Sequence, residues 1–152
     1  MVTITKLQHS DIPEVAQLEW QNFSEPWSKH AFEESFEQEQ YTFFVARLEK
    51  KVVGYIGVYF AADEGNVTTF AVDEALRRKH IGRKLMEHLF LECRKKQIST
   101  LFLEVRRSNT LAQAFYRALG FKADGIRKLF YDKPREDAVL MSRMIEQKYE
   151  DK

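Results

Sequence analysis

The chain has 152 residues, and its 24 lysines and arginines nearly balance its 23 aspartates and glutamates, which leaves a formal net charge of +1. A near-neutral chain has no overall field that would draw it to nucleic acid or to an acidic membrane, so we expect neither partner and predict that any anion site is local. This length fits one domain with a core of its own, and we expect residues 1–152 to form a single domain.

Cysteine and histidine usage argues against disulfides and metal sites. Cys93 is the single cysteine, which excludes an intramolecular disulfide framework and a cysteine-based zinc cluster. The four histidines lack the paired spacing of a metal site, and we predict no metal. The N-terminus does not resemble a signal peptide, and no apolar run approaches the roughly 20 residues of a membrane span. We therefore expect a cytoplasmic protein.

The first part of the chain is predicted to contain one strand and two helices. Residues 2–7 alternate like a strand, and Ser10-Asp11 is then placed to cap a helix. A break at Pro26-Trp27 precedes Ser28, which is placed to cap a second short helix. The apolar residues on these two helices are Ile12, Val15, Leu18 and Trp20 on the first, and Phe32 and Phe36 on the second.

The middle of the chain is predicted to be β-rich. Residues 41–48 and 52–60 are typical of two strands, and the short polar segment between them fits a hairpin turn. Residues 66–73 form a third strand. Gly54 and Gly57 lie within the second strand, where they weaken pairing and allow a bulge or a close backbone approach.

The last half reads as a helix from 81 to about 96, a strand at 101–105 and a helix that Asn109 caps. With the preceding strand, this series implies a parallel pair within a mixed sheet, and therefore a mixed α/β fold of α+β-like character. Residues 120–121 and 137–144 are predicted to supply the last strands, after a loop containing Pro134, and the polar tail 146–152 is predicted to fray. The residues expected to face inward on the last helix are Leu111, Phe115 and Ala118.

A basic turn separates the strand at 66–73 from the helix that follows. A helix N-terminus presents unpaired N–H groups and the positive end of its dipole, so this turn is suited to phosphate. The alternative is a basic helix start that only solvates its charges. The residues of the predicted pyrophosphate site are Arg78, Lys79, His80, Ile81, Gly82 and Arg83.

Two further side chains have chemistry suited to proton transfer. Glu104 follows an apolar segment, where partial burial would raise the pKa of its carboxyl toward the range of a base. Tyr116 lies two turns along the helix opened by Asn109. At this position its phenol can reach the end of the sheet at which a phosphate-bearing cofactor would bind. The alternatives are a solvated glutamate at a strand edge and an aromatic residue packed on the sheet.

This order of strand, basic turn, helix, strand and helix resembles the acetyl-coenzyme A binding core of the GNAT superfamily of N-acetyltransferases. Residues 104–106, Asn109, Tyr116 and 135–138 resemble its RimI-type branch, which acetylates the N-terminal alanine of a small-subunit ribosomal protein. The resemblance covers nearly the whole chain. It implies a central mixed sheet of about six to seven strands flanked by about four helices, and direct acetyl transfer from acetyl-CoA to an amine.

The resemblance also implies residue roles. Glu104 would accept the proton of the amine, directly or through water, and Tyr116 would donate a proton to the thiolate. Family members carry glycine where His80 stands, which affects the conformation of the turn. The residues implied to contact the cofactor in addition to the turn are Phe70, Ala71, Val72, Arg77 and Asn109, and those implied to border the peptide groove are Pro26, Trp27, Arg135, Glu136 and Asp137.

Three other functions are consistent with the sequence. A GNAT enzyme for another amine, such as an internal lysine, a polyamine or an antibiotic, would share these motifs. A non-catalytic acyl-CoA binding module is favoured only by His80. An RNA-binding protein would use Arg106-Arg107 and the basic run 94–96, but the neutral charge and the lack of interleaved aromatic residues argue against it.

Overall fold

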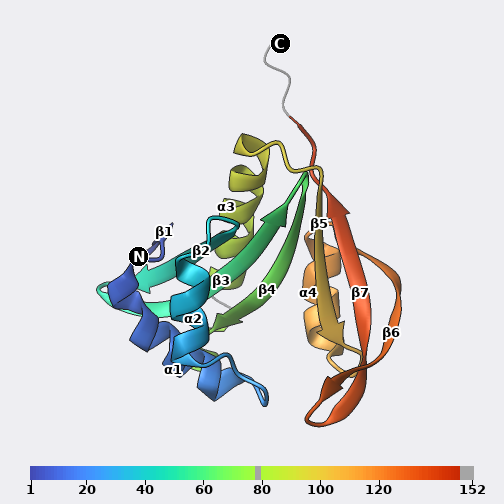
Figure 1. Ribbon diagram of the computed structural model, residues 1–152, viewed down its shortest axis with the longest axis horizontal. Coiled ribbons are helices and arrows are strands. Elements are labelled where there is room, and N and C mark those ends of the chain that lie inside the picture. The colour runs from blue at the N-terminus through green and yellow to red at the C-terminus, as the bar shows by residue number, and fades with distance from the viewer. Residues whose placement is uncertain (78–79, 148–152) are drawn as a thin grey trace.

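The chain folds into one seven-stranded mixed sheet with helices on both faces (Figure 1). The structure is a computed structural model that describes residues 1–77 and 80–147. The predicted mixed fold is confirmed, including a sheet of six to seven strands and, in the described ranges, four α-helices. The strands are β1 (Val2–Lys6), β2 (Tyr41–Leu48), β3 (Lys51–Ala61), β4 (Glu64–Val72), β5 (Thr100–Arg106), β6 (Lys122–Asp132) and β7 (Arg135–Met144), and the helices are α1 (Ile12–Asn22), α2 (Lys29–Phe36), α3 (Ile81–Lys95) and α4 (Thr110–Ala118).

The strand order is β1-β2-β3-β4-β5-β7-β6, and the pair β4–β5 is parallel whereas the other neighbours are antiparallel. Helix α3 connects β4 to β5, as a parallel pair requires. This result confirms the predicted parallel pair. Residues 73–80 connect the end of β4 to the start of α3, where the phosphate turn was predicted.

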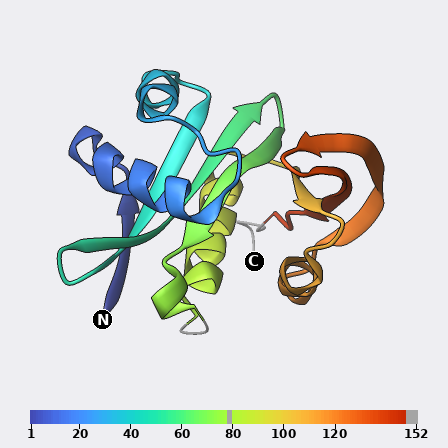
Figure 2. The same cartoon turned by 90° about the horizontal axis from the view of Figure 1, so that it is seen from below.

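Two apolar clusters hold the helices to opposite faces of the sheet (Figure 2). Helices α1 and α2 cover the half formed by β1 to β4 on one face, where Ile12, Phe32 and Tyr55 are fully buried. Helices α3 and α4 lie on the other face, and Leu85 and Leu89 of α3 are fully buried there. No helix in the described residues is long and apolar enough to cross a membrane.

Polar residues fix the helix starts as the sequence indicates, with one exception. Ser28 accepts a hydrogen bond from the Ala31 N–H and Asn109 from the Ala112 N–H, so both predicted N-caps are confirmed. Asp11 is the residue before α1 but makes no capping bond to that helix. Its carboxylate instead accepts from the Gln8 N–H and forms an ion pair of 2.6 Å with Arg47 of β2.

Two predictions about helix faces are wrong. On α1, Trp20 is 70% exposed, and the neighbouring Glu19 is buried in its place. On α4, Leu111 is 80% exposed and Ala118 is also exposed. The stripe that packs inward on α4 is shifted by one position and consists of Ala112, Phe115, Tyr116 and Leu119.

The C-terminal hairpin is longer than predicted. Residues 120–121 precede β6 rather than forming a strand, because Gly120 has a φ of 94° and ends the helical segment. Pro134 lies in a tight turn between β6 and β7 instead of a longer loop. Strand β6 is at the sheet edge and almost entirely exposed, so its sequence lacks the alternation that marks a half-buried strand.

The end of the chain, as far as it is described, is held against the end of α3 and the connection from α3 to β5. The Gln147 side chain donates to the carbonyls of Ile98 and Ile145, and the Glu146 carbonyl accepts from Arg94. The rest of the tail predicted to fray, residues 148–152, lies outside the described residues.

Gly57 is required by the packing of β2 against β3. The pairing of β3 with β4 shifts register at Gly57/Val58, so the predicted bulge is present. A Cβ at Gly57 would lie 2.4 Å from the Phe43 ring, whereas a Cβ at Gly125 would meet nothing within 4 Å.

We expect Gly57→Ala to lower the free energy of unfolding by about 1–3 kcal/mol, because Phe43 is buried and its ring packs against the rings of Trp27, Phe32 and Tyr41. Urea denaturation measures this change. Gly125→Ala is the matched control and should leave the midpoint nearly unchanged. Equal midpoints for the two variants would contradict this account of Gly57.

Candidate active site

The sheet divides between β4 and β5. The two strands pair at Glu64↔Thr100, Gly65↔Leu101 and Asn66↔Phe102 and then diverge, so that a V-shaped gap separates their ribbons (Figure 1). Beyond Asn66 and Phe102, no strand in the described chain pairs with the facing edges of β4 and β5. These edges leave backbone N–H and C=O groups that a bound molecule can satisfy.

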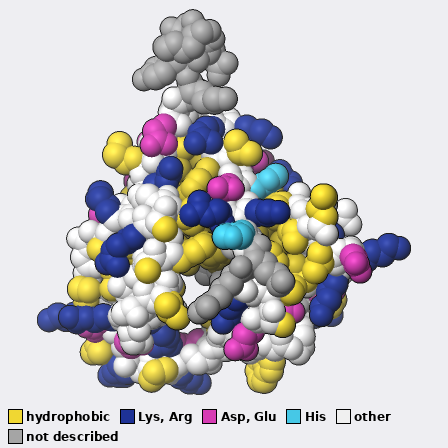
Figure 3. All heavy atoms as spheres, turned by 180° about the vertical axis from the view of Figure 1, so that it is seen from behind, with side chains coloured by type: hydrophobic (Ala, Val, Ile, Leu, Met, Phe, Trp, Pro, Cys, Tyr) yellow, Lys and Arg dark blue, Asp and Glu magenta, His cyan; other side chains and the backbone are white. Residues whose placement is uncertain are grey.

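The predicted phosphate turn leads into α3 on the far face of the sheet. His80 has a left-handed backbone, with φ 63° and ψ 17°, a conformation that suits glycine, the residue that the family resemblance implies here. Histidine adopts this conformation more readily than a β-branched residue does. Arg83 and Lys84 of α3 are exposed. Several Lys, Arg and His side chains gather on the face seen in Figure 3. Arg78 and Lys79 lie outside the described residues.

The turn, β4 and α4 meet around Gly82. A Cβ at Gly82 would lie 3.3 Å from Phe70 of β4 and 3.4 Å from Phe115 of α4. The structure therefore brings the predicted residues Phe70, Gly82 and Tyr116 together at the divergence of the sheet. The predicted cofactor residue Arg77 contacts α1 instead of this cluster, because its guanidinium donates a hydrogen bond to the Asn22 side chain at the end of that helix.

Tyr116 is held in an aromatic cluster on the α4 side of the gap. Its ring centroid lies 6.3 Å from that of Phe70 and 5.7 Å from that of Phe121. Burial raises the pKa of the Tyr116 phenol, and the nearby Tyr131 adds to the effect. The phenol therefore stays protonated at neutral pH, as a proton donor must.

Glu104 lies in β5 on the other face of the sheet. Its neighbours Leu103 and Val105 belong to the core under α3 and α4, so the alternation of the strand directs Glu104 away from those helices. It lines a cavity of about 670 Å³ together with Phe102, Asn66 and Leu140. Asn66 and Phe102 are the last pair before the strands diverge, so the cavity lies at the point of the V.

The environment of Glu104 is suited to a base. Burial raises the pKa of its carboxyl above the ordinary value, and the positive charge of Arg127 opposes part of that rise. The Arg127 guanidinium lies 3.6 Å from the Glu104 carboxylate. The rise in pKa expected from the apolar sequence before Glu104 is therefore present.

Tyr131 of β6 is a site residue that the sequence analysis missed. Burial raises its pKa to about 12, and the negative charge of Glu104 adds to this rise while Arg106 opposes it. Its charge also affects the pKa of Tyr116. Tyr131 is therefore within electrostatic reach of both predicted catalytic residues.

Arg106 joins the two segments predicted to border a peptide groove. Its guanidinium donates to the Ser24 hydroxyl and lies 3.5 Å from the Glu25 carboxylate, both in the loop between α1 and α2. The same group donates to the carbonyls of Lys133 and Pro134 at the β6–β7 turn and to Glu136. It also stacks 4.3 Å from the Tyr131 ring centroid.

The segments of Pro26-Trp27 and of Arg135, Glu136 and Asp137 are therefore neighbours in space. Glu25 strengthens the connection by accepting from the N–H groups of Asp132 and Lys133. Within the two segments, however, several predicted residues are engaged internally. Trp27 packs on Phe32 and Phe43, Glu136 binds Arg106 and the Ser108 N–H, and Asp137 pairs with Arg107.

A buried carboxylate fixes the position of the first segment. Glu19 of α1 is 2% exposed and accepts hydrogen bonds from the hydroxyls of Tyr55 and Thr69, each at 2.6 Å, and from the Trp27 N–H at 2.9 Å. It thus connects the loop at Trp27 to strands β3 and β4. The sequence offers no signal for this contact beyond a glutamate on an otherwise apolar helix face.

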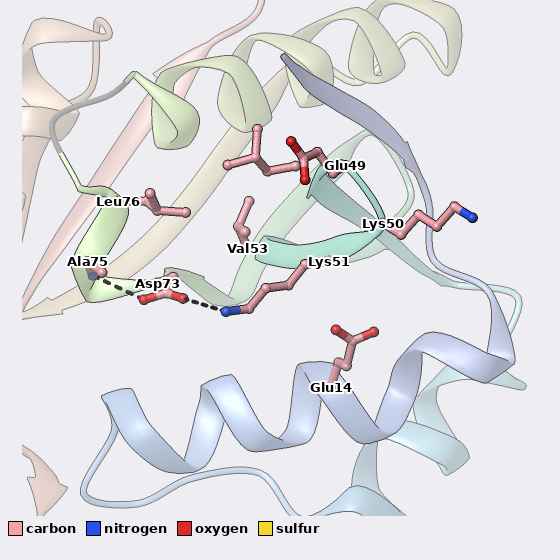
Figure 4. A pocket seen from close by; sticks show the side chains of 9 residues that line it. Glu14, Glu49, Lys50, Lys51, Val53, Asp73, Ala75 and Leu76 are labelled. Atoms are coloured by element: carbon pink, nitrogen blue, oxygen red, sulfur yellow. Dashed lines mark hydrogen bonds and ion pairs between the residues drawn. The ribbon is translucent and has the colours of Figure 1, made fainter.

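A second cavity, of about 660 Å³, lies between α1 and the β2–β3 turn (Figure 4). Glu14, Lys51 and Asp73 line it, and Lys51 lies 4.0 Å from Asp73. It shares no lining residue with the cavity at Glu104. It contains none of the predicted catalytic or substrate residues and is separate from the site at the V.

The described residues contain no cluster of three or more His, Cys, Asp and Glu side chains placed to hold a metal ion. Cys93 is fully buried on the inner face of α3, and burial raises the pKa of its thiol to about 12. The thiol is therefore protonated and inaccessible. Covalent catalysis by Cys93 is not supported by this environment.

A parallel pair that diverges beside a helix N-terminus, with a raised-pKa carboxylate on one face and a protonated phenol on the other, is typical of an acyltransferase with a phosphate-bearing cofactor. Residues 12–121 match the model of the acetyltransferase (GNAT) family. The chain belongs to this family and is an acetyl-CoA-dependent N-acetyltransferase.

Relatives with known names match over nearly the full chain. The [ribosomal protein bS18]-alanine N-acetyltransferase of Escherichia coli K12 is 36% identical over 147 residues, which cover 95% of this chain and 99% of that one. The N-alpha-acetyltransferase RimI of Mycobacterium tuberculosis is 34% identical over 148 residues, 93% of this chain and 92% of its own. The crystal structure of the ribosomal-protein-S18-alanine N-acetyltransferase from Escherichia coli superposes with a TM-score of 0.90 at 34% identity, covering 100% of this chain and 99% of that one.

We expect Arg106→Lys to raise the KM for a peptide substrate by about three- to tenfold, because lysine cannot reproduce the planar donor set that joins both groove segments. The affinity for acetyl-CoA should not change. Steady-state kinetics and calorimetry measure the two quantities. Arg107→Lys is the matched control, since Arg107 is 64% exposed and pairs only with Asp137 among the described residues. A similar KM in both variants would contradict the assignment.

Proposed function

We propose that this protein acetylates the α-amino group of a protein N-terminus, with the N-terminal alanine of a small-subunit ribosomal protein as its substrate. The observation that carries the proposal is the position of Glu104 on β5 beside the divergence from β4, two residues before Arg106, which joins the two loop segments. The name of the E. coli relative, which matches over 95% of this chain, supports the same substrate class.

The residues present fit acetyl-CoA. The unpaired edge of β4 at Phe70, Ala71 and Val72 offers backbone groups to an extended chain, and the turn at His80 directs the N-terminus of α3 toward phosphates. Asn109 already caps α4, and the same side chain is adjacent to the end of β5. When bound, acetyl-CoA supplies the acetyl group as a thioester.

Two side chains then move protons. Glu104 takes a proton from the substrate's ammonium group, and the amine nitrogen forms the C–N bond as the C–S bond breaks. Tyr116 gives its phenolic proton to the departing sulfur, and the second proton that the nitrogen loses on becoming an amide restores the phenol. An α-amino group has a pKa near 8 and a lysine side chain about 10.4, so an N-terminal amine demands less of a single glutamate.

The alternative of a non-catalytic acyl-CoA binding module loses its one supporting feature. That reading rested on histidine at a glycine position, but His80 adopts the left-handed conformation without disturbing the start of α3 at Ile81. The raised pKa of Glu104 and the buried phenol of Tyr116 are better explained by proton transfer than by cofactor storage.

We expect the protein to acetylate a peptide with a free N-terminal alanine and to leave a blocked peptide with an internal lysine unmodified. Glu104→Gln should lower kcat by about 10²–10⁴-fold, since the amide cannot accept the proton, and Tyr116→Phe should also lower it while keeping the aromatic packing. Tandem mass spectrometry locates the acetyl group. Both variants should retain acetyl-CoA affinity, and modification of the lysine instead would favour another amine substrate.

The rate should depend on pH through Glu104. Because burial raises the pKa of this carboxyl above 4.5, the fraction of ionised base falls, and kcat falls with it, as the pH drops through a value above 4.5. A kcat–pH profile at saturating substrates measures this acid limb. The limb should be absent from the residual activity of Glu104→Gln, and its persistence there would assign the titration to another group.

A further inference from the structure

Arg127 makes the one ion pair that Glu104 has within the described part of the chain. The Arg127 Nη1 atom lies 3.6 Å from the Glu104 Oε2 atom. The two residues are on β6 and β5, which β7 separates, so the arginine extends over β7 to reach the carboxylate. The pairing of Arg127 with the small, fully buried Ala138 of β7 leaves room for this path.

The ion pair with Arg127 occupies a carboxylate oxygen of Glu104, which is the proton acceptor in the proposed reaction. A substrate amine near neutral pH carries a positive charge, and it must bring that charge to the Glu104 carboxylate. The Arg127 guanidinium has only hydrogen-bond donors and no acceptor, so it cannot take the substrate's proton in place of Glu104. Two cations on one desolvated carboxylate would repel each other.

Arg127 can move away from Glu104 without becoming a buried, unpaired charge itself, and the incoming ammonium group then replaces it as the counter-ion of the less exposed Glu104. The Arg127 side chain is 56% exposed, whereas that of Glu104 is 20% exposed. β6 pairs irregularly with β7 between Arg127 and Tyr131, and Leu129 in this segment has a φ of 52°. The guanidinium already lies 5.2 Å from the Phe130 ring centroid, which offers a cation–π contact outside the cavity.

We propose that Arg127 is a positioning residue that stands in for the substrate's ammonium group on Glu104 in the free enzyme and moves outward when the substrate binds. The inference rests on the proposed function, because it takes Glu104 to be the base. Arg127 keeps the carboxylate ionised and ready to receive a cation. Its departure leaves the ammonium as the only cation on a desolvated carboxylate, which favours proton transfer to Glu104.

Three other charged residues line the same cavity, and none of them forms an ion pair with Glu104 among the described residues. Lys122 and Asp124 of β6 form an ion pair with each other, and Glu64 lies at the start of β4. Tyr131 is protonated, since burial raises its pKa to about 12. Removal of Arg127 should therefore change the titration of Glu104 more than that of these groups.

The first test is the titration of Glu104 in the free protein, followed by carboxyl ¹³C NMR in the wild type, in Arg127→Gln and in Lys128→Gln. The pKa of Glu104 should be higher in Arg127→Gln than in the wild type and unchanged in Lys128→Gln, whose side chain is the neighbouring exposed cation. Equal values in all three proteins would overturn the proposal. This measurement needs no turnover, so it is separate from any failure of the proposed function.

The second test uses kinetics with a peptide that begins with alanine. A half-exposed ion pair of this kind is worth little, so Arg127→Gln should lower the peptide KM by about two- to fivefold. It should also shift the acid limb of kcat/KM, which reports the free enzyme, to higher pH. Arg127→Lys, which keeps the charge, should restore both values toward the wild type, and Lys128→Gln should change neither. A raised KM in Arg127→Gln would show that Arg127 binds the substrate and would overturn the stand-in role. Absence of transfer by the wild type would instead contradict the proposed function.

Discussion

The divergence of β4 and β5 after one short stretch of parallel pairing is the constraint on which the site depends. Pairing ends at Asn66↔Phe102, and the remaining edges of both strands are free for a ligand. The buried helix α3 and the antiparallel partners β3 and β7 hold each strand in place on its outer side. An unpaired backbone edge inside a domain is unfavourable unless a bound molecule satisfies it. In the proposed mechanism, these free edges of the sheet form part of the cofactor site.

The two faces of the divergence have different chemistry because of what covers them. On the α4 face, aromatic packing desolvates Tyr116 and keeps its phenol protonated. On the other face no helix covers Glu104, and burial by the cavity walls is opposed by the charge of Arg127. In the proposed mechanism, the proton donor and the proton acceptor thus lie on opposite faces of the sheet, with the reacting bond between them.

Much of this arrangement could be predicted from local sequence patterns. The hairpin of β2 and β3, the long amphipathic α3, and the caps Ser28 and Asn109 follow from periodicity and capping chemistry, which act within a few residues. What could not be predicted depends on contacts between distant segments. Arg106 binds Ser24 from 82 residues away, and β6 is an exposed edge strand whose sequence has no alternation. Tyr131 and Arg127 lie on that strand, so the half of the site that it provides was missed.

Two arginines in the same half of the sheet show how surroundings determine the role of one residue type. Arg106 is 22% exposed and is bound by two backbone carbonyls, a hydroxyl and two carboxylates, so its removal leaves many acceptors unsatisfied. Arg127 is 56% exposed and has a single carboxylate partner among the described residues. A groove that must recognise a peptide benefits from the first kind of contact, which fixes both segments. A base that must accept a new cation at each turnover benefits from the second, because a weakly held counter-ion can be exchanged at little cost in free energy.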